Sequence, residues 1–131
     1  MDERDLDIVD RFILPERQER YRALISSGKR NKAIGRLSSS TDVNMKFART
    51  ISAQDESRLT DLLKSLGALP TCYVMSQLSK IDGREMPLAD ALDAVMYTDS
   101  GSILLCNPGR LGYYEGELGE RYILIRNPKK N

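Results

Sequence analysis

Residues 101–126 read GSILLCNPGRLGYYEGELGERYILIR, and this stretch decides the fold class. It holds three short segments rich in aliphatic and aromatic residues, and turns that contain Asn, Pro and Gly separate them. Segments of this kind between such turns are typical of β-strands. The stretch therefore predicts an antiparallel meander, whose strands are 103–106, 111–115 and 122–125.

The rest of the chain supplies helices and one further strand. Apolar residues recur at helical spacing in five segments, namely 2–14, 15–27, 29–37, 59–66 and 87–96. The clearest helix ends before Gly67, and Ser52 is its expected N-cap. A single apolar face requires burial, so we expect this helix to bury all of its leucines, which are Leu59, Leu62, Leu63 and Leu66.

Two other segments decide the sheet. Residues 43–51 alternate as a strand would but also fit a helical turn, and we expect a helix. Residues 71–76 predict a buried strand, and a helix separates them from the meander. Such a crossover normally joins parallel strands, so we expect strand 71–76 to lie parallel to a neighbour.

The combined prediction is one α+β domain, residues 1–131. Residues 1–66 are mainly helical, and residues 71–126 form a strand, a helix and the meander. We expect the N-terminal helices to pack on one face of a mixed sheet of about four strands.

The composition excludes several kinds of site. The chain has no histidine, which rules out histidine-based catalytic triads and histidine-ligated zinc. Cys72 and Cys106 lack the spacing of a zinc motif, so we expect two buried, reduced thiols. No cofactor or metal site is predicted. The start has no apolar signal segment and no run is long enough for a membrane span, so we expect a cytoplasmic protein.

Positive charge is concentrated in one segment, although the net charge of the whole chain is only +1. Residues 17–49 carry a net charge of +7, whereas residues 2–16 carry −4. Basic side chains on consecutive helices are typical of proteins that bind phosphate backbones. One hypothesis is therefore nucleic-acid or other polyanion binding through Arg20, Lys29, Arg30, Lys32 and Arg36. The alternative is a solvated surface that the acidic first helix partly neutralises.

The meander carries a second group of polar and aromatic residues, which are Arg110, Tyr113, Tyr114, Glu115, Glu117 and Arg121. Tyrosine and arginine are enriched at the centres of protein interfaces. The leading hypothesis is therefore a non-catalytic regulatory or interaction protein that binds a protein partner, or a second copy of itself, through these residues. The same side chains could instead form ion pairs on the solvated face of a hairpin. A third hypothesis is a small hydrolase or transferase that uses Glu115 and Glu117 for acid–base catalysis.

Overall fold

The computed structural model describes residues 2–51 and 55–126. The helices are α1 (Glu3–Phe12), α2 (Pro15–Ser26), α3 (Arg30–Gly35), α4 (Glu56–Ser65) and α5 (Leu88–Val95). The strands are β1 (Ala48–Thr50), β2 (Thr71–Ser76), β3 (Glu85–Pro87), β4 (Ser102–Asn107), β5 (Leu111–Glu115) and β6 (Arg121–Ile125). Three short 3₁₀ turns lie between α3 and β1, namely η1 (Arg36–Ser38), η2 (Ser40–Asp42) and η3 (Met45–Phe47). The predicted α+β class is confirmed.

The strands form one six-stranded sheet in the order β1-β6-β5-β4-β2-β3. Strands β4, β5 and β6 pair as the predicted meander. The expected mixed sheet with a parallel strand 71–76 was wrong, because every pairing is antiparallel. The reason is β3, which the sequence pattern did not reveal. Strands β3 and β4 flank β2 and both run opposite to it, so the α5 crossover joins β3 to β4 and not β2 to a parallel neighbour.

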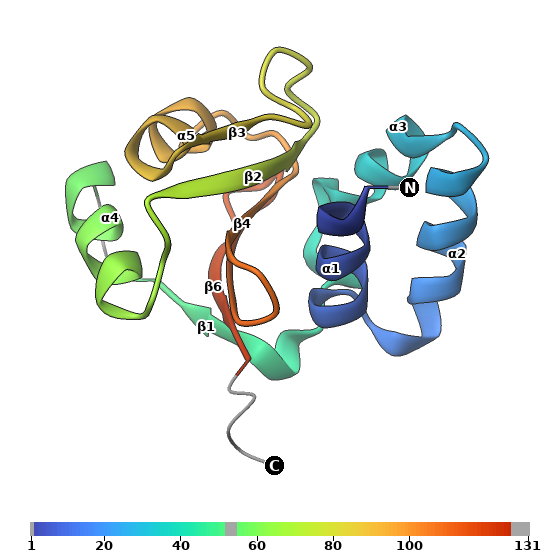
Figure 1. The fold of residues 1–131 in the computed structure, drawn as a ribbon, viewed down its shortest axis with the longest axis horizontal. Coiled ribbons are helices and arrows are strands. Elements are labelled where there is room, and N and C mark those ends of the chain that lie inside the picture. The colour runs from blue at the N-terminus through green and yellow to red at the C-terminus, as the bar shows by residue number, and fades with distance from the viewer. Residues whose placement is uncertain (1, 52–54, 127–131) are drawn as a thin grey trace.

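Helices cover both faces of the sheet, with α1, α2 and α3 on one side and α4 and α5 on the other (Figure 1). The expectation that the N-terminal helices pack on one face is confirmed for α1, α2 and α3, whereas α4 lies on the other face. Successive side chains of a strand point to opposite faces. In β2, Cys72 and Val74 face α4 and α5, whereas Tyr73 and Met75 face the N-terminal helices, and all four are buried. The long apolar runs of β2 and β4 follow from this double coverage.

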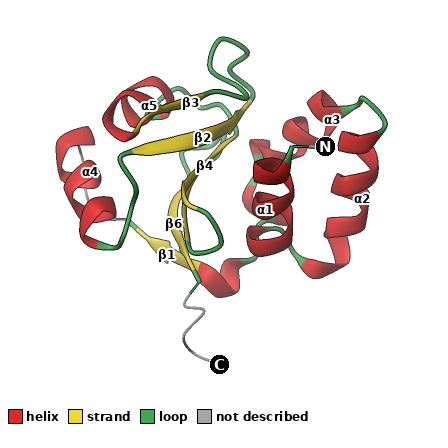
Figure 2. Ribbon diagram, viewed as in Figure 1, coloured by secondary structure: helices red, strands yellow, loops and turns green. Residues whose placement is uncertain are grey.

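The segment 43–51 is not the expected helix. It forms the 3₁₀ turn η3 and then β1, whose Ala48 pairs with Leu124 of β6 (Figure 2). Val43 also makes an isolated bridge to Ile13, directly after α1. The alternating apolar pattern of the segment was the better guide, because pairing with β6 satisfies backbone groups that a short helix would leave unpaired.

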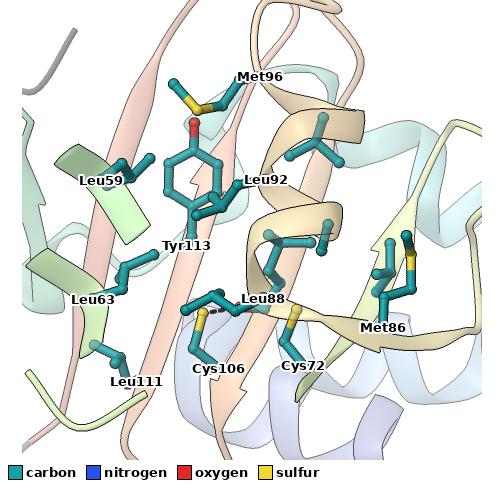
Figure 3. Packing of buried hydrophobic residues seen from close by; sticks show 14 of the residues in the cluster. Leu59, Leu63, Cys72, Met86, Leu88, Leu92, Met96, Cys106, Leu111 and Tyr113 are labelled. Carbon is teal, nitrogen blue, oxygen red and sulfur yellow. Dashed lines mark hydrogen bonds between the residues drawn. The ribbon is translucent and has the colours of Figure 1, made fainter. Parts of the chain in front are cut away.

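The layer of α4 and α5 packs through an apolar cluster (Figure 3). Leu59 and Leu63 of α4 lie beside Tyr113 and Leu92 over the sheet. Cys72 and Cys106 belong to the same cluster and are free and buried, as predicted. Burial raises the pKa of the Cys72 thiol to about 12 and that of Cys106 well above its usual value. Both thiols are therefore protonated and unreactive in the folded protein.

Two expectations for α4 were wrong. Its N-cap is Asp55, whose carboxylate accepts a hydrogen bond from the backbone N–H of Arg58 at 2.8 Å, and the predicted cap Ser52 lies outside the described residues. Leu62 and Leu66 are 38% and 40% exposed, so only part of the leucine face is buried. Within the described residues, no helix has the length and apolar character needed to cross a membrane.

Candidate functional site

The two adjacent tyrosines of β5 lie in the core and not on a surface. Tyr113 faces α4 and α5, Tyr114 faces the N-terminal helices, and both are fully buried. The Tyr114 hydroxyl donates to the Leu37 carbonyl at 2.7 Å. The prediction that these rings contact a partner was wrong, because β5 is an interior strand covered on both faces. The binding hypothesis itself is not tested by their burial.

The remaining predicted residues do not form one surface. Arg110 and Glu117 are exposed, but they lie at opposite ends of β5. Glu115 is buried and Arg121 is half-buried, and the two residues face each other across β5 and β6. The structure therefore brings together Glu115 and Arg121, near Glu117, and separates them from Arg110.

Glu115 is a buried carboxyl group at the end of β5. Burial raises its pKa above the usual value, and the Tyr113 hydroxyl opposes this rise by donating to Oε1 at 2.7 Å. Hydrogen bonds from the backbone of Tyr97 and Thr98 and the charge of Arg121 also lower the pKa. The carboxyl group thus ties the end of the meander to the loop that follows α5.

That loop has an unusual backbone. Tyr97 and Asp99 have positive φ angles of 64° and 58°. The left-handed region costs a non-glycine residue about 1–2 kcal/mol, and such residues occur often at functional sites. Tyr97 is nevertheless 61% exposed, with the Arg121 guanidinium 5.0 Å from its ring centre. The sequence contains no signal for this conformation.

A second exposed apolar side chain lies in the turn between β5 and β6. Leu118 is 86% exposed, and its backbone N–H donates to Glu120 at 3.0 Å. The turn is held against the chain after α3, because the backbone N–H of Glu117 donates to the Ser38 carbonyl at 2.6 Å. A fixed turn thus displays Leu118 to solvent. We call the set Tyr97, Glu117, Leu118 and Arg121 the meander tip.

The catalytic hypothesis finds little support in this arrangement. Glu115 is buried, whereas Glu117 is exposed on the following turn, so the two carboxyl groups do not face a common cleft. A cavity of about 500 Å³ opens beside Thr98, but its other lining residues come from 77–81 and α5. Within residues 2–51 and 55–126, no group of three acidic or cysteine side chains could hold a metal ion.

Part of the positive charge of the basic helical segment is neutralised within the fold. Arg30 donates to both carboxylate oxygens of Asp5, at 2.9 and 3.1 Å, and also to Asp82. The Tyr73 hydroxyl donates to the buried Asp5 at 2.6 Å. This cluster joins α1 and α3 to β2. The charge of Arg30 is matched inside the protein, which removes the reason for counting it as a polyanion contact.

Arg36 is used in the same way. It donates to Asp42 at 2.8 Å, and the buried Asp42 also accepts from the Tyr21 hydroxyl at 2.8 Å. Arg17 lies 3.6 Å from the same carboxylate. Of the predicted polyanion contacts, three remain exposed and without an ion pair to the described residues, namely Arg20, Lys29 and Lys32. Polyanion binding through this segment stays a prediction with a weaker basis.

Comparison of the chain with protein-family models, curated proteins and solved structures found no match. The geometry of its own residues therefore has to carry any functional proposal.

Proposed function

We propose that this is a non-catalytic binding protein that holds a protein partner at the meander tip. The observation that carries the proposal is the exposed Tyr97, which sits on a strained backbone next to the buried Glu115. Residues with unfavourable backbone angles cluster at binding and active sites. Here the strained backbone places an aromatic ring in solvent.

The composition of the meander tip also fits a protein interface. Tyr97 and Arg121 are the residue types that contribute most to interface affinity, and Leu118 offers an apolar side chain that has almost no cover in the free protein. The turn is fixed because its Glu117 backbone N–H donates to the Ser38 carbonyl and its Glu120 carboxylate accepts from the Ser40 backbone N–H, so binding would order few further groups. Both features favour recognition of a protein surface.

Position-specific cross-linking tests the proposal. A photoreactive phenylalanine analogue placed at position 97, and separately at position 62, is exposed to an extract from cells that contain the protein. Position 62 is a matched control, because Leu62 is a partly exposed apolar residue on α4, away from the meander tip. We expect a discrete adduct from position 97 only, and Leu118→Ser should abolish it. Equal labelling from both positions would overturn the proposal.

A comparison of two variants separates binding from folding. Tyr97→Ala and Tyr97→Gly both remove the ring and its contact with Arg121, but only glycine relieves the left-handed backbone. We expect the free energy of unfolding of Tyr97→Gly to exceed that of Tyr97→Ala by about 1 kcal/mol, so the glycine variant is the more stable. Both should lose the partner, with a fall in affinity of about 2 kcal/mol as for other interface tyrosines. Partner binding that survives in both variants would show that Tyr97 is not a contact.

A further inference from the structure

Four cationic residues from four separate segments lie at the end of the sheet opposite the meander tip. They are Arg11 at the end of α1, Lys46 in η3, Arg110 before β5 and Arg126 after β6, and we call them the basic row. The backbone N–H of Arg126 donates to the Arg110 carbonyl at 2.8 Å. Figure 1 shows the β4–β5 loop, the end of β6 and the helical turn before β1 together at this end of the sheet.

Phe47 connects the members of the row. The Arg126 guanidinium lies 4.5 Å from the centre of the Phe47 ring, and the Lys46 ammonium lies 5.8 Å from the same point. On the other side of Arg110, the backbone of Gly109 lies next to Arg11 and donates to the Asp7 carboxylate at 2.6 Å. The row thus runs from η3 across β6 and β5 to α1.

The charge of this row is poorly matched inside the protein, in contrast to that of Arg30 and Arg36. In the described part of the chain, Lys46, Arg110 and Arg126 have no carboxylate within ion-pair distance. Arg11 has Asp7 at 3.6 Å, and the same carboxylate also accepts from Gly109. Lys46 and Arg110 are exposed.

We propose that the basic row binds the backbone of single-stranded nucleic acid, with the Phe47–Arg126 pair as a platform for a base. The row has four cationic side chains, so it can neutralise up to about four phosphates of one strand. Nucleobases stack on aromatic rings and on guanidinium planes, and the structure holds one of each together. Anionic lipid head groups have no planar base that could stack on such a platform.

The row lies at the other end of β5 from the meander tip, so this inference does not depend on the proposed function. It also differs from polyanion binding through α2 and α3, because Lys46 is its only member within residues 17–49. The two basic surfaces can therefore be tested against each other with substitutions that change the charge equally.

Fluorescence anisotropy with labelled twelve-nucleotide oligothymidine and oligouridine tests the proposal over a series of salt concentrations. For three or four phosphate contacts, the logarithm of the binding constant should fall with the logarithm of salt with a slope of about −2 to −3. The double variant Lys46→Glu/Arg110→Glu should bind at least about tenfold more weakly and show a flatter slope. Phe47→Leu should weaken binding by about tenfold and leave the slope unchanged.

The matched control is Arg20→Glu/Lys32→Glu, which makes the same change in net charge on exposed residues of α2 and α3. Urea denaturation of each variant verifies that it is folded. The proposal is supported if the protein binds either oligonucleotide, the Lys46→Glu/Arg110→Glu variant loses this binding and the Arg20→Glu/Lys32→Glu control keeps it. Absence of binding at low salt, a stronger effect of the control variant, equal affinity for duplex DNA, or binding to phosphatidylserine vesicles without binding to oligonucleotides would each overturn it.

Discussion

The two faces of the sheet are held by different chemistry. Aliphatic side chains and two buried cysteines fill the space under α4 and α5, and the buried carboxyl group of Glu115 lies at one margin of that layer. The face under α1, α2 and α3 also has an apolar cluster, but it contains the buried acids Asp5 and Asp42 with their arginine and tyrosine partners. One face therefore depends mainly on apolar burial, and the other depends on burial and on paired charge.

This difference explains part of the positive charge in the sequence. The net charge of residues 17–49 is strongly positive, yet Arg30 faces Asp5 and Asp82 from other segments, and Arg36 faces Asp42 within the same segment. Burying a charge is unfavourable unless a partner of opposite charge accompanies it. The buried acids therefore account for Arg30 and Arg36. They do not account for Arg20, Lys29 and Lys32, which are exposed.

The largest effect is expected from breaking the charged cluster on the N-terminal face. Arg30→Ala leaves the buried Asp5 without its cationic partner and close to Asp82. Loss of one member of a buried ion pair typically costs about 3–5 kcal/mol. We expect the free energy of unfolding, measured by urea denaturation, to fall by about this amount. Arg20→Ala, an exposed arginine in the same basic segment, should change it by less than about 0.5 kcal/mol.

Comparable effects of Arg30→Ala and Arg20→Ala would contradict the assignment of Arg30 to the interior. A rescue experiment is also available. Asp5→Asn removes the buried charge that Arg30 compensates, so the double variant Asp5→Asn/Arg30→Ala should lose less stability than the two single losses added together.

The cysteines of the opposite face show whether the two layers unfold together. In the wild-type protein Cys72 and Cys106 are buried, and a thiol reagent at pH 8 should label them only through opening of the fold. If the domain unfolds cooperatively, a loss of about 3 kcal/mol in Arg30→Ala should accelerate labelling by about a hundredfold. A labelling rate that stays constant while urea stability falls would mean that the N-terminal layer detaches alone.

A loss of about 3 kcal/mol is also expected on the apolar face from Leu63→Ala, because a cavity forms under α4. Leu62→Ala on the same helix should cost about 1 kcal/mol or less, since this leucine is 38% exposed. Urea denaturation of both variants in high salt sharpens the comparison of the two faces. Salt should change the effect of Arg30→Ala more than that of Leu63→Ala, because it screens charges and not apolar contacts.

Local patterns in the sequence predicted the elements but not their arrangement. The meander, α4 and α5 were found because their apolar periods and turn residues lie within short windows. Strand β3 was missed because it has three residues and ends at Pro87. Because the prediction lacked β3, it placed the start of the crossover at β2 and therefore made β2 parallel to a neighbouring strand. The apolar run at 103–106 did carry a signal that was not used, since such a run indicates cover on both faces of a strand.

Each candidate surface was only partly visible in the sequence. Glu117 and Arg121 of the meander tip and Arg110 of the basic row were predicted site residues, but the other members were not. Tyr97 has a positive φ, but tyrosine is not a residue type that favours the left-handed region, so the residue type at this position does not indicate the conformation. The tyrosines at 113 and 114 resembled an interface because tyrosine is enriched at protein interfaces. Adjacent strand residues point to opposite faces, and only the structure shows that both faces are covered. The basic row assembles from positions 11, 46, 110 and 126, which no window of the sequence contains together.

The smallest effect tests the one carboxyl group on the apolar face. Because burial raises the pKa of Glu115 above its ordinary value of 4.5, the folded protein binds this proton more tightly than the unfolded chain does. The stability contributed by that proton is fully present below pH 4.5 and is lost as the pH rises through the folded-state pKa. Glu115→Gln keeps an oxygen for the Tyr113 hydroxyl and cannot ionise.

The wild type should therefore lose stability relative to Glu115→Gln as the pH rises from 4.5 toward neutrality, and urea denaturation of both proteins across that range measures the difference. The difference in unfolding free energy between the two proteins cancels the contributions of the other carboxyl groups. One of these is Asp2, and its hydrogen bond with Arg4 lowers its pKa to about 2. Glu117→Gln, on the exposed turn, should show no such trend. A difference that is constant with pH, or one that favours the wild type at neutral pH, would show that Tyr113 and Arg121 compensate the buried charge completely.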